Sequence, residues 1–432
     1  MRVEDILAQG FADYAEHVNP PVARRAGLSG EPVRVARVAG GCLVLEDGRV
    51  IEDFHGTQAF GHRNETVTRA VRDFLDSDSA SWFPARVNPY GGSLAARLCA
   101  RSGYGNVYLA GSGSEAVEAA LKLARAATGR SRILGLEGAY HGCTMGSCAL
   151  MAEGPYREPF APHLPDVERL PFGDVDALRA AFAAGGVAGV IVEPIQLEGG
   201  VRPLPAAYLA ALCEETAAAG ALLVADEVQT GLGRTGRFLA SEVWPRRPDA
   251  VLLGKHLGGG LMPISAMLTR RELFERAYGK SFESSEAHNS TFSGSAPVCV
   301  AAHAALDLLD DALVARVGEL GRTFRRGLTE ALAGNPLFDE VRGDGLAVGI
   351  VLKPTDHPWV SFESFGMEEL AGKPSVGLLL CHRLYRRGYF TFVCGHDWRV
   401  LRLQPRFTIE PEKLAAFTRV VRDELETLCS LN

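Results

Sequence analysis

The sequence lacks the features that mark membrane proteins, secreted proteins and metal centres. No stretch approaches the ~20 consecutive apolar residues that a helix needs to cross a membrane, and the start of the chain carries acids rather than the pattern of a signal peptide. None of the nine cysteines stands in a Cys-x-x-Cys pair, and no spacing typical of metal ligands emerges. We therefore expect no metal, no membrane partner and reduced thiols in a cytoplasmic protein.

An excess of positive charge is missing as well. The chain has 45 lysines and arginines against 52 aspartates and glutamates, a net charge of −7, and its Arg-Arg pairs are scattered. This balance argues against a nucleic-acid partner. What the chain does have is 432 residues, of which 47% are hydrophobic and 22% charged. This composition is typical of a globular protein, and the length predicts a large domain accompanied by a smaller one.

Short apolar runs alternate with helical patterns through the middle of the chain. Strands that are apolar on both faces and separated by helices predict an α/β fold with a mostly parallel sheet covered on both sides. Ligands of such sheets bind beyond the carboxyl ends of the strands. This rule brings Glu193, Asp226 and Lys255, which close or follow three of the strands, to one place. The predicted strands are Asn106–Leu109, Arg132–Leu136, Gly189–Glu193, Ala221–Asp226, Ala250–Leu253 and Ile264–Leu268, and the predicted helices include Ser114–Ala127 and Ala206–Ala219.

Beyond about residue 320 the pattern changes to helix, strands and helix, which predicts a smaller α+β domain. Its markers are Glu340–Ile350, Leu378–Arg387 and Val400–Ile409. The segment Lys353–Pro374 is rich in proline, glycine and aromatic residues, and it is predicted to be an irregular loop. This loop is either a lid or a plain surface excursion.

Lys255 is the residue that says most about chemistry. A predicted strand, Ala250–Leu253, ends just before this lysine, and glycines follow it at 258–260. Partial desolvation at a strand end lowers the pKa of an amine and frees its lone pair, which is what Schiff-base chemistry requires. The alternative is an ordinary loop lysine before a glycine-rich turn.

A phosphate site is predicted where small residues follow one strand and open a helix. Ser112 and Glu115 have the Ser-x-x-Glu spacing of a capping box. The free N–H groups at the start of the helix, around Gly113 and Ser114, favour a phosphate. The Gly-Lys-Ser/Thr ending of a nucleotide P-loop is missing, which disfavours a nucleoside triphosphate. A capped helix without a ligand is the alternative.

Two further motifs offer groups for a planar, cationic ring. Asp226 is an acid at a buried strand end and needs a cation, which a protonated ring nitrogen would supply. Val228 can then press on the ring face, and Gln229 can donate to a ring hydroxyl. Tyr140, which precedes His141, can stack on the same ring. The alternatives are an arginine or a helix cap as the partner of Asp226, and packing of Tyr140 on core side chains.

A phosphate site, an acid for a pyridinium, a stacking aromatic and an imine-forming lysine are together what pyridoxal 5′-phosphate requires. Three runs carry a resemblance to a known family: Glu193-Pro-Ile-Gln, Asp226-Glu-Val-Gln-Thr-Gly-Leu-Gly-Arg-Thr-Gly, and Gly254-Lys255 with the glycines that follow. On these runs the sequence resembles the class III (ω-amino acid type) aminotransferases, among them the ornithine, acetylornithine and putrescine aminotransferases.

The resemblance implies fold type I, which is a mostly parallel, seven-stranded sheet flanked by helices, with a smaller α+β domain built from the two chain ends. The implied domains are residues 1–55, which contribute to the small domain, residues 56–315, which form the large cofactor-binding domain, and residues 316–432, which form the C-terminal small domain.

Roles for the cofactor site follow from the same resemblance. It implies that Lys255 forms the Schiff base with the cofactor and moves the proton, while Asp226 keeps the pyridine nitrogen protonated. It implies that Gln229 contacts the ring hydroxyl, and that Tyr140 and Val228 sandwich the ring. The other implied cofactor-binding residues are Ser112, Gly113, Ser114, His141, Glu193 and Thr291, of which Thr291 reaches the phosphate of the other subunit in a homodimer with shared active sites.

For the substrates, the resemblance assigns Arg402 to a carboxylate clamp. It assigns Glu198 to neutralising this arginine when an amine without that carboxylate binds. The alternative is a fixed surface ion pair. Three departures from the family leave the amine donor open. The tyrosine that ornithine-type members carry before the first strand has no clear counterpart near Val33. Arg406 stands where the family has a proline, and it either adds a second anion contact or faces the surface. Cys143 stands where ornithine-type members have an arginine.

The predicted function is a ping-pong transfer of an amino group from an ω-amine or amino acid to a 2-oxo acid, 2-oxoglutarate or pyruvate. The first alternative is an aminomutase or racemase with the same cofactor, which would consume no 2-oxo acid. A non-catalytic ligand-binding homologue is a more distant alternative.

Overall fold

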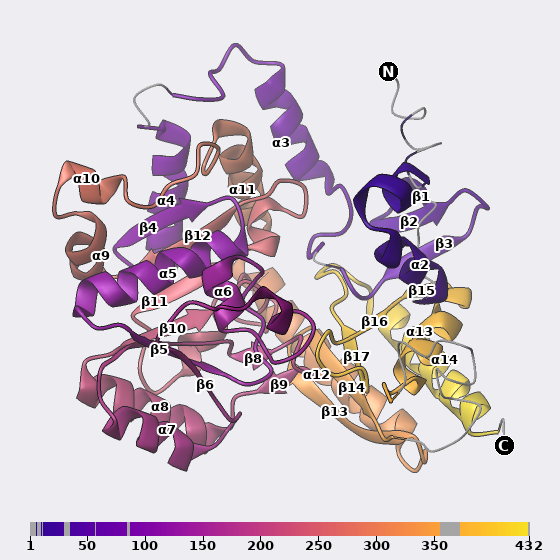
Figure 1. Cartoon of the computed structure of the whole chain (residues 1–432). Coiled ribbons are helices and arrows are strands. Elements are labelled where there is room, and N and C mark those ends of the chain that lie inside the picture. The colour runs from indigo at the N-terminus through magenta and orange to yellow at the C-terminus, as the bar shows by residue number, and fades with distance from the viewer. Residues whose placement is uncertain are drawn as a thin grey trace.

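The computed structural model in Figure 1 describes residues 6, 10, 12–29, 35–56, 58–83, 87–354 and 372–430. Most of the predicted loop Lys353–Pro374 lies outside these residues. In the part of the chain that is described, every helix is too short or too polar to span a membrane.

A seven-stranded sheet forms the centre of the larger part of the molecule (Figure 1). Four of its neighbouring pairs are parallel, and β12 alone runs antiparallel to both of its neighbours, β4 and β11. The prediction of a mostly parallel sheet is therefore confirmed. In sheet order the strands are β4 (Asn106–Ala110), β12 (Ser265–Thr269), β11 (Ala250–Leu253), β10 (Leu222–Asp226), β7 (Val187–Val192), β5 (Arg132–Leu136) and β6 (Val167–Leu170), of which only β6 was not predicted.

Both faces of this sheet are buried. Alternate residues of each strand point to opposite sides, and the side chains on each side pack in a hydrophobic cluster. On β10, Leu222 and Val224 pack with the helix α5, whereas Leu223 and Ala225 pack in the cluster that contains α8. The helices of this part are α3 (Glu65–Leu75), α4 (Pro89–Ser102), α5 (Gly113–Thr128), α6 (Met145–Ala149), α7 (Val175–Ala183), α8 (Ala206–Ala219), α9 (Arg271–Tyr278), α10 (Phe282–Ser285) and α11 (Ala296–Leu308).

The two chain ends meet in a second part of the molecule. Strand β15 (Tyr389–Phe390) pairs in parallel with β3 (Val50–Asp53), so a C-terminal segment completes the N-terminal sheet β1–β2–β3. Another antiparallel sheet has the order β13–β14–β17–β16. The other elements are α2 (Pro20–Ser29), β1 (Val35–Ala39), β2 (Cys42–Leu45), α12 (Asp311–Leu332), β13 (Phe338–Asp344), β14 (Ala347–Leu352), α13 (Val376–Arg386), β16 (Phe392–Val393), β17 (Val400–Leu403) and α14 (Pro411–Cys429).

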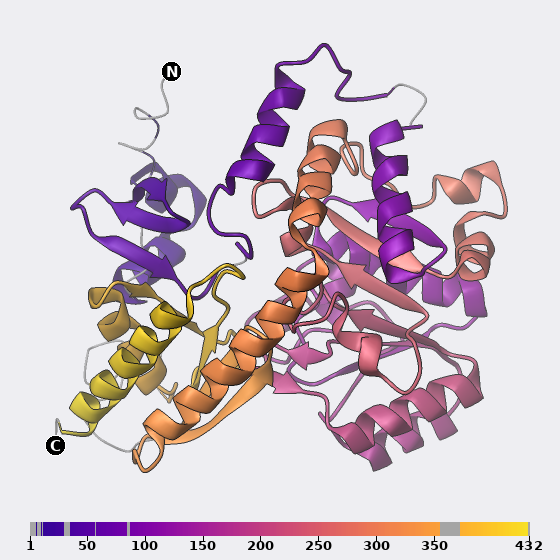
Figure 2. The same ribbon diagram turned by 180° about the vertical axis from the view of Figure 1, so that it is seen from behind.

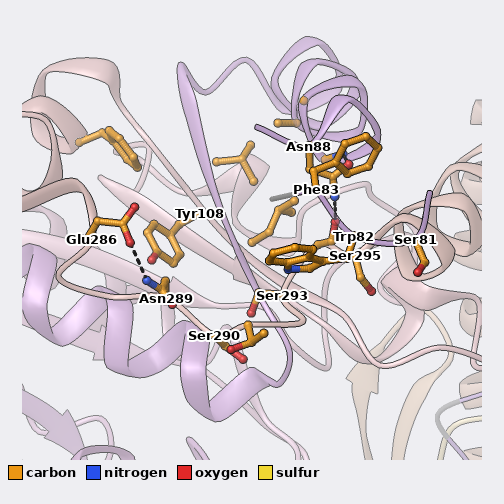
Figure 3. Close-up of a pocket in the computed structure, with 18 residues that line it drawn as sticks. Ser81, Trp82, Phe83, Asn88, Tyr108, Glu286, Asn289, Ser290, Ser293 and Ser295 are labelled. Atoms are coloured by element: carbon orange, nitrogen blue, oxygen red, sulfur yellow. Dashed lines mark hydrogen bonds between the residues drawn. The ribbon is translucent and has the colours of Figure 1, made fainter. Parts of the chain in front are cut away.

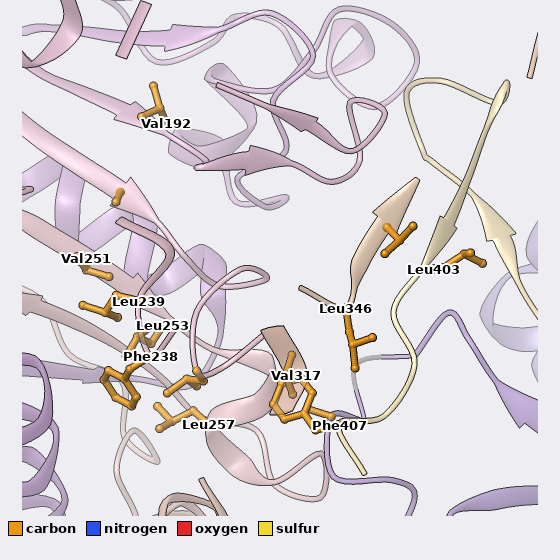
Figure 4. Close-up of a cluster of buried hydrophobic side chains, with 14 of the residues drawn as sticks. Val192, Phe238, Leu239, Val251, Leu253, Leu257, Val317, Leu346, Leu403 and Phe407 are labelled. Atoms are coloured by element: carbon orange, nitrogen blue, oxygen red, sulfur yellow. The ribbon is translucent and has the colours of Figure 1, made fainter. Parts of the chain in front are cut away.

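One hydrophobic core runs through both parts. It joins Val251 and Leu253 of the central sheet to Leu346 and Leu403 of the smaller sheet (Figure 4). The long helix α12 crosses between the two parts (Figure 2), and the predicted domain boundary at 315/316 falls inside it. The predicted domain limits therefore stay a prediction.

Candidate active site

A cavity of ≈290 Å³ lies beyond the carboxyl ends of β4, β7, β10 and β11. This is close to the lower end of the range for small-molecule sites, about 300 to 1,000 Å³. The strand-end rule correctly predicted that Glu193, Asp226 and Lys255 lie together. The cavity is lined by Gly111, Ser112, Gly113, Ser114, Tyr140, His141, Gly142, Glu193, Asp226, Val228, Gln229, Lys255, Met262, Pro263, Ile264 and Ser265.

Lys255 begins a short 3₁₀ helix directly after β11 and has a left-handed backbone, with φ of 43°. A side-chain-bearing residue in this region is strained and persists only where the surroundings impose it. The preceding residue must be glycine, because a Cβ at Gly254 would lie 2.7 Å from Oγ of Ser265. Burial lowers the pKa of Lys255, and no described residue hydrogen-bonds to its Nζ. The direction of this pKa shift is the one that the sequence predicted for a lysine at a strand end.

Asp226 has a partner that the sequence did not predict. Its Oδ2 lies 2.7 Å from Nδ1 of the fully buried His141, while Oδ1 accepts the N–H of Val228 at 3.1 Å. Burial alone would lower the pKa of His141, but the hydrogen bond and the charge of Asp226 outweigh burial and raise it. The Nε2 atom of His141 has no partner among the described residues. The pair therefore places the carboxyl group of Asp226 at the wall of the cavity, with the imidazole of His141 beside it.

Glu193 is a buried carboxyl group without a cation of its own. Its Oε1 accepts the N–H of Tyr140 at 2.9 Å, and this bond fixes the loop that carries the aromatic ring. Burial raises the pKa of Glu193 to about 7. The hydroxyl group of Tyr140 lies 3.4 Å from Sγ of Cys143. Glu193 therefore acts on the cavity through the position of Tyr140.

The start of α5 forms the predicted cradle. Ser112 is the N-cap, and its Oγ accepts the N–H of Glu115 at 3.2 Å. The carboxylate of Glu115 returns to the N–H of Gly111 rather than to that of Ser112, so the capping box closes one residue earlier than predicted. Gly113 and Ser114 are the first two helical residues, where N–H groups have no partner within the helix. These groups and the positive helix end favour an anion at this wall.

Arg402 and Glu198 form a buried ion pair beside the cavity. Arg402 also donates a hydrogen bond to Oε1 of Gln229, at 3.4 Å. Glu198 also accepts a hydrogen bond from the backbone N–H of Gly395, at 3.0 Å. Burial alone would raise the pKa of Glu198, but Arg402 and the N–H of Gly395 lower it. The side chains are only 8% and 18% exposed, so a surface ion pair is not what the structure contains.

Two predicted site residues line other cavities. Arg406 donates to Glu52 at 3.1 Å and to Glu410 at 3.0 Å, and it lines a different cavity. It is neither a surface residue nor a neighbour of Lys255, because two carboxylates hold it away. Thr291 is exposed and lines a third cavity of ≈450 Å³ (Figure 3).

Sequence reasoning missed two groups of residues. Met262, Pro263, Ile264 and Ser265 line the cavity because β12 runs antiparallel, which brings its amino end to the carboxyl edge of its neighbours. An antiparallel assignment for this strand would have found them. His55, whose ring faces Arg402, was also missed, since a lone histidine carries no signal in the sequence.

These groups fit pyridoxal phosphate. The start of α5 suits its phosphate, the His141–Asp226 pair suits a protonated ring nitrogen, and Lys255 offers an amine with no hydrogen-bonding partner among the described residues. Val228 borders the same cavity as an apolar wall for the ring. Thr291 is the one predicted cofactor residue that the described chain leaves apart from this set.

Comparisons with known proteins point the same way. Residues 26–425 match the family described as aminotransferase class-III. The acetylornithine aminotransferase of Mycobacterium tuberculosis is 43% identical over 331 residues, which are 74% of this chain and 79% of that protein. The aminotransferase PigE of a Serratia species is 31% identical over 96% of this chain, and this chain spans about half, 53%, of the length of that protein.

Two solved structures extend the likeness to three dimensions. The ornithine aminotransferase of Toxoplasma gondii ME49 has a TM-score of 0.84 at 28% identity, over 99% of this chain and 96% of that one. An amine transaminase from an uncultivated Pseudomonas species, solved with bound PLP, has a TM-score of 0.80 at 27% identity, over 91% and 94% of the two chains.

Proposed function

Because this chain belongs to the class-III aminotransferases, pyridoxal-phosphate-dependent transaminases of fold type I, we propose that the cavity around Lys255 transfers an amino group from an amine donor to a 2-oxo acid. The observation that carries the proposal is the amine of Lys255, which has no partner among the described residues and shares its cavity with Asp226 and the start of α5. When bound there, pyridoxal phosphate supplies the electron sink that makes a proton on the substrate carbon removable.

The residues of this chain then have defined tasks. Lys255, with its pKa lowered by burial, takes and returns the proton at the substrate carbon. Asp226, held by His141, stabilises positive charge at the opposite end of the cavity. Tyr140 and Val228 exclude water from the two faces of a planar ring, and Gln229 orients its hydroxyl group.

The two half-reactions use two kinds of substrate. We assign Arg402 to the carboxylate of the 2-oxo acid, either 2-oxoglutarate or pyruvate, and Glu198 to neutralising Arg402 while an ω-amine or amino acid donates. A buried guanidinium without a partner carries a penalty of several kcal/mol, which Glu198 removes. That relatives are named for acetylornithine and ornithine favours a donor with its amino group at a chain end. It also favours transfer over an aminomutase, a racemase or a non-catalytic role.

Chemical trapping tests this proposal directly. Borohydride reduction of the holoenzyme, followed by peptide mapping, is expected to find the cofactor on Lys255. The Lys255→Ala variant should lose turnover by several orders of magnitude while still folding, because the proton carrier is gone. Arg276→Ala, on the outer helix α9, is the matched control and should behave as wild type. Cofactor mapped to another lysine would refute the assignment.

We further propose a homodimer with shared active sites, in which Thr291 completes the phosphate site of the partner. Trp82, 49% accessible, lines the cavity of Thr291 (Figure 3), and Phe292, the next residue along the chain from Thr291, is 73% accessible. Large apolar groups gathered at a surface favour an interface. Light scattering should give twice the chain mass, and mixing Lys255→Ala with Thr291→Asp subunits should restore activity by forming one intact site. A monomer that turns over substrate would contradict this. A cytoplasmic location stays a prediction from the cysteine content.

A further inference from the structure

His55 lies directly against the guanidinium of Arg402. The Nη2 atom of Arg402 is 3.3 Å from Nε2 and 3.5 Å from Nδ1 of the imidazole. The other terminal nitrogen, Nη1, is already engaged by Glu198 and by Gln229. The imidazole therefore flanks the side of the guanidinium that the ion pair leaves for another acceptor.

The chain holds His55 in this place from three directions. The backbone N–H groups of His55 and Gly56 both donate to Oδ1 of Asp53, at 2.9 and 2.8 Å. These two bonds close a tight turn at the end of β3. A side chain at Gly56 would collide with the carboxylate of Asp53. The rings of Phe390 and Phe392 meet the imidazole edge-on, with centroids at 5.5 and 5.6 Å.

The register of the small sheet explains why these groups meet. Phe392 on β16 is the direct partner of Arg402 on β17, so the ring and the guanidinium belong to one cross-strand pair. His55 arrives from the N-terminal sheet, which β15 joins to the C-terminal part. A rigid imidazole between two aromatic rings loses little entropy when it binds a ligand.

We propose that His55 is a specificity-determining residue of the acceptor half-reaction, forming with Arg402 the subsite that receives the carboxylate of the 2-oxo acid. The proposal rests on the transaminase function above. A carboxylate that binds Nη2 of Arg402 replaces the ring nitrogen of His55 as its acceptor and comes to lie beside the imidazole. In the tautomer that carries the proton on this nitrogen, the imidazole donates its N–H to the carboxylate. With two donors, one from Arg402 and one from His55, the carboxylate is held in a single orientation. Acceptors without that carboxylate gain nothing from His55.

Matched pairs of acceptors test this inference. Pyruvate is compared with acetaldehyde, and 2-oxoglutarate with succinic semialdehyde, because each aldehyde lacks only the carboxylate next to the carbonyl group. For His55→Phe, which keeps a ring between Phe390 and Phe392, we expect KM for each 2-oxo acid to rise about tenfold, the size of one hydrogen bond to a charged group. The aldehydes should keep their wild-type KM and kcat.

His55→Gln, which retains a donor, should recover part of the lost affinity for the 2-oxo acids. If His55→Phe raises KM for acids and aldehydes alike, or for neither, the imidazole only packs the site and the proposal falls. Thermal unfolding of both variants separates misfolding from a binding effect. A wild-type enzyme that consumes no acceptor would instead refute the transaminase function itself.

Discussion

Arg402 and Arg406 follow each other on one stretch of chain, and each lies buried against a glutamate, yet their surroundings differ. Arg406 donates through all three of its nitrogens, to Glu52, Thr408 and Glu410, and its main partner Glu52 also binds Lys413 at 2.6 Å. The Nε atom of Arg402 has no partner among the described residues, and its guanidinium contacts Gln229, which lines the cavity. A saturated pair stabilises the fold, whereas an unsaturated pair beside a cavity remains available to a ligand.

The largest expected effect is a loss of catalytic activity when Arg402 is replaced, which replacing Arg406 should not cause. Arg402→Ala should lower kcat/KM for 2-oxo acids about a thousandfold, because two charge-assisted hydrogen bonds to the carboxylate disappear. The donor half-reaction with an amine that has no carboxylate should be affected far less, as single-turnover absorbance measurements would show. Equal losses in both half-reactions would place Arg402 outside the carboxylate subsite.

The next effect is on stability. Arg406→Met should lower the free energy of unfolding by about 3 to 4 kcal/mol, because Glu52 loses a buried partner and keeps only Lys413. Steady-state constants per folded site should stay at the wild-type level, since Arg406 lies away from the cavity of Lys255. Urea unfolding and kinetics on the same preparation check both parts. Lost activity with unchanged stability would reverse the assignment of the two arginines.

A smaller effect comes from Glu193, a buried carboxyl group that forms no ion pair with an arginine in the described part of the chain. The pKa of Glu193 is raised from 4.5 to about 7, so the folded state holds a proton that the unfolded state releases. The resulting stability is present below pH 4.5 and is lost as the pH rises through about 7. Relative to Glu193→Gln, wild type should lose up to about 3 kcal/mol between these limits.

Thermal unfolding across this pH range measures the difference between wild type and Glu193→Gln. Glu412→Gln, at an exposed position on α14, is the control and should follow wild type at every pH. Parallel curves for wild type and Glu193→Gln would mean that Glu193 is charged in the fold. It would then resemble Glu198, whose pKa the neighbouring arginine lowers.

The sequence predicted the central sheet well because its strands are buried on both faces. A run such as Ala250–Leu253 is apolar throughout, and its bounds were predicted without error. Residues at the ends of such strands, among them Asp226 and Lys255, could be grouped from the amino-acid pattern alone. Strand β6 was missed because its residues are only partly buried and so carry charge, as at Glu168 and Arg169.

Side-chain pairing was harder to predict, since it depends on register and on distant segments. Nothing in the sequence near Asp226 identifies His141 as its partner, because the two are 85 residues apart. Arg406 was expected to bind an anion or face the surface, but Glu52, 354 residues away, occupies it. Such contacts follow from the tertiary fold, which local patterns do not encode.

The pairing of β15 with β3 has a consequence for synthesis on the ribosome. The backbone of β3 at Glu52 and Asp53 is matched by Tyr389 and Phe390, which leave the exit tunnel only after the whole stretch of chain between the two strands has been made. Until then, this edge of the N-terminal sheet stays open to pairing with other nascent chains. The apolar side chains of Leu43 and Ile51 in this sheet also lack their packing partner Phe390 until then. Strand β3 is therefore made long before its native neighbour β15 becomes available.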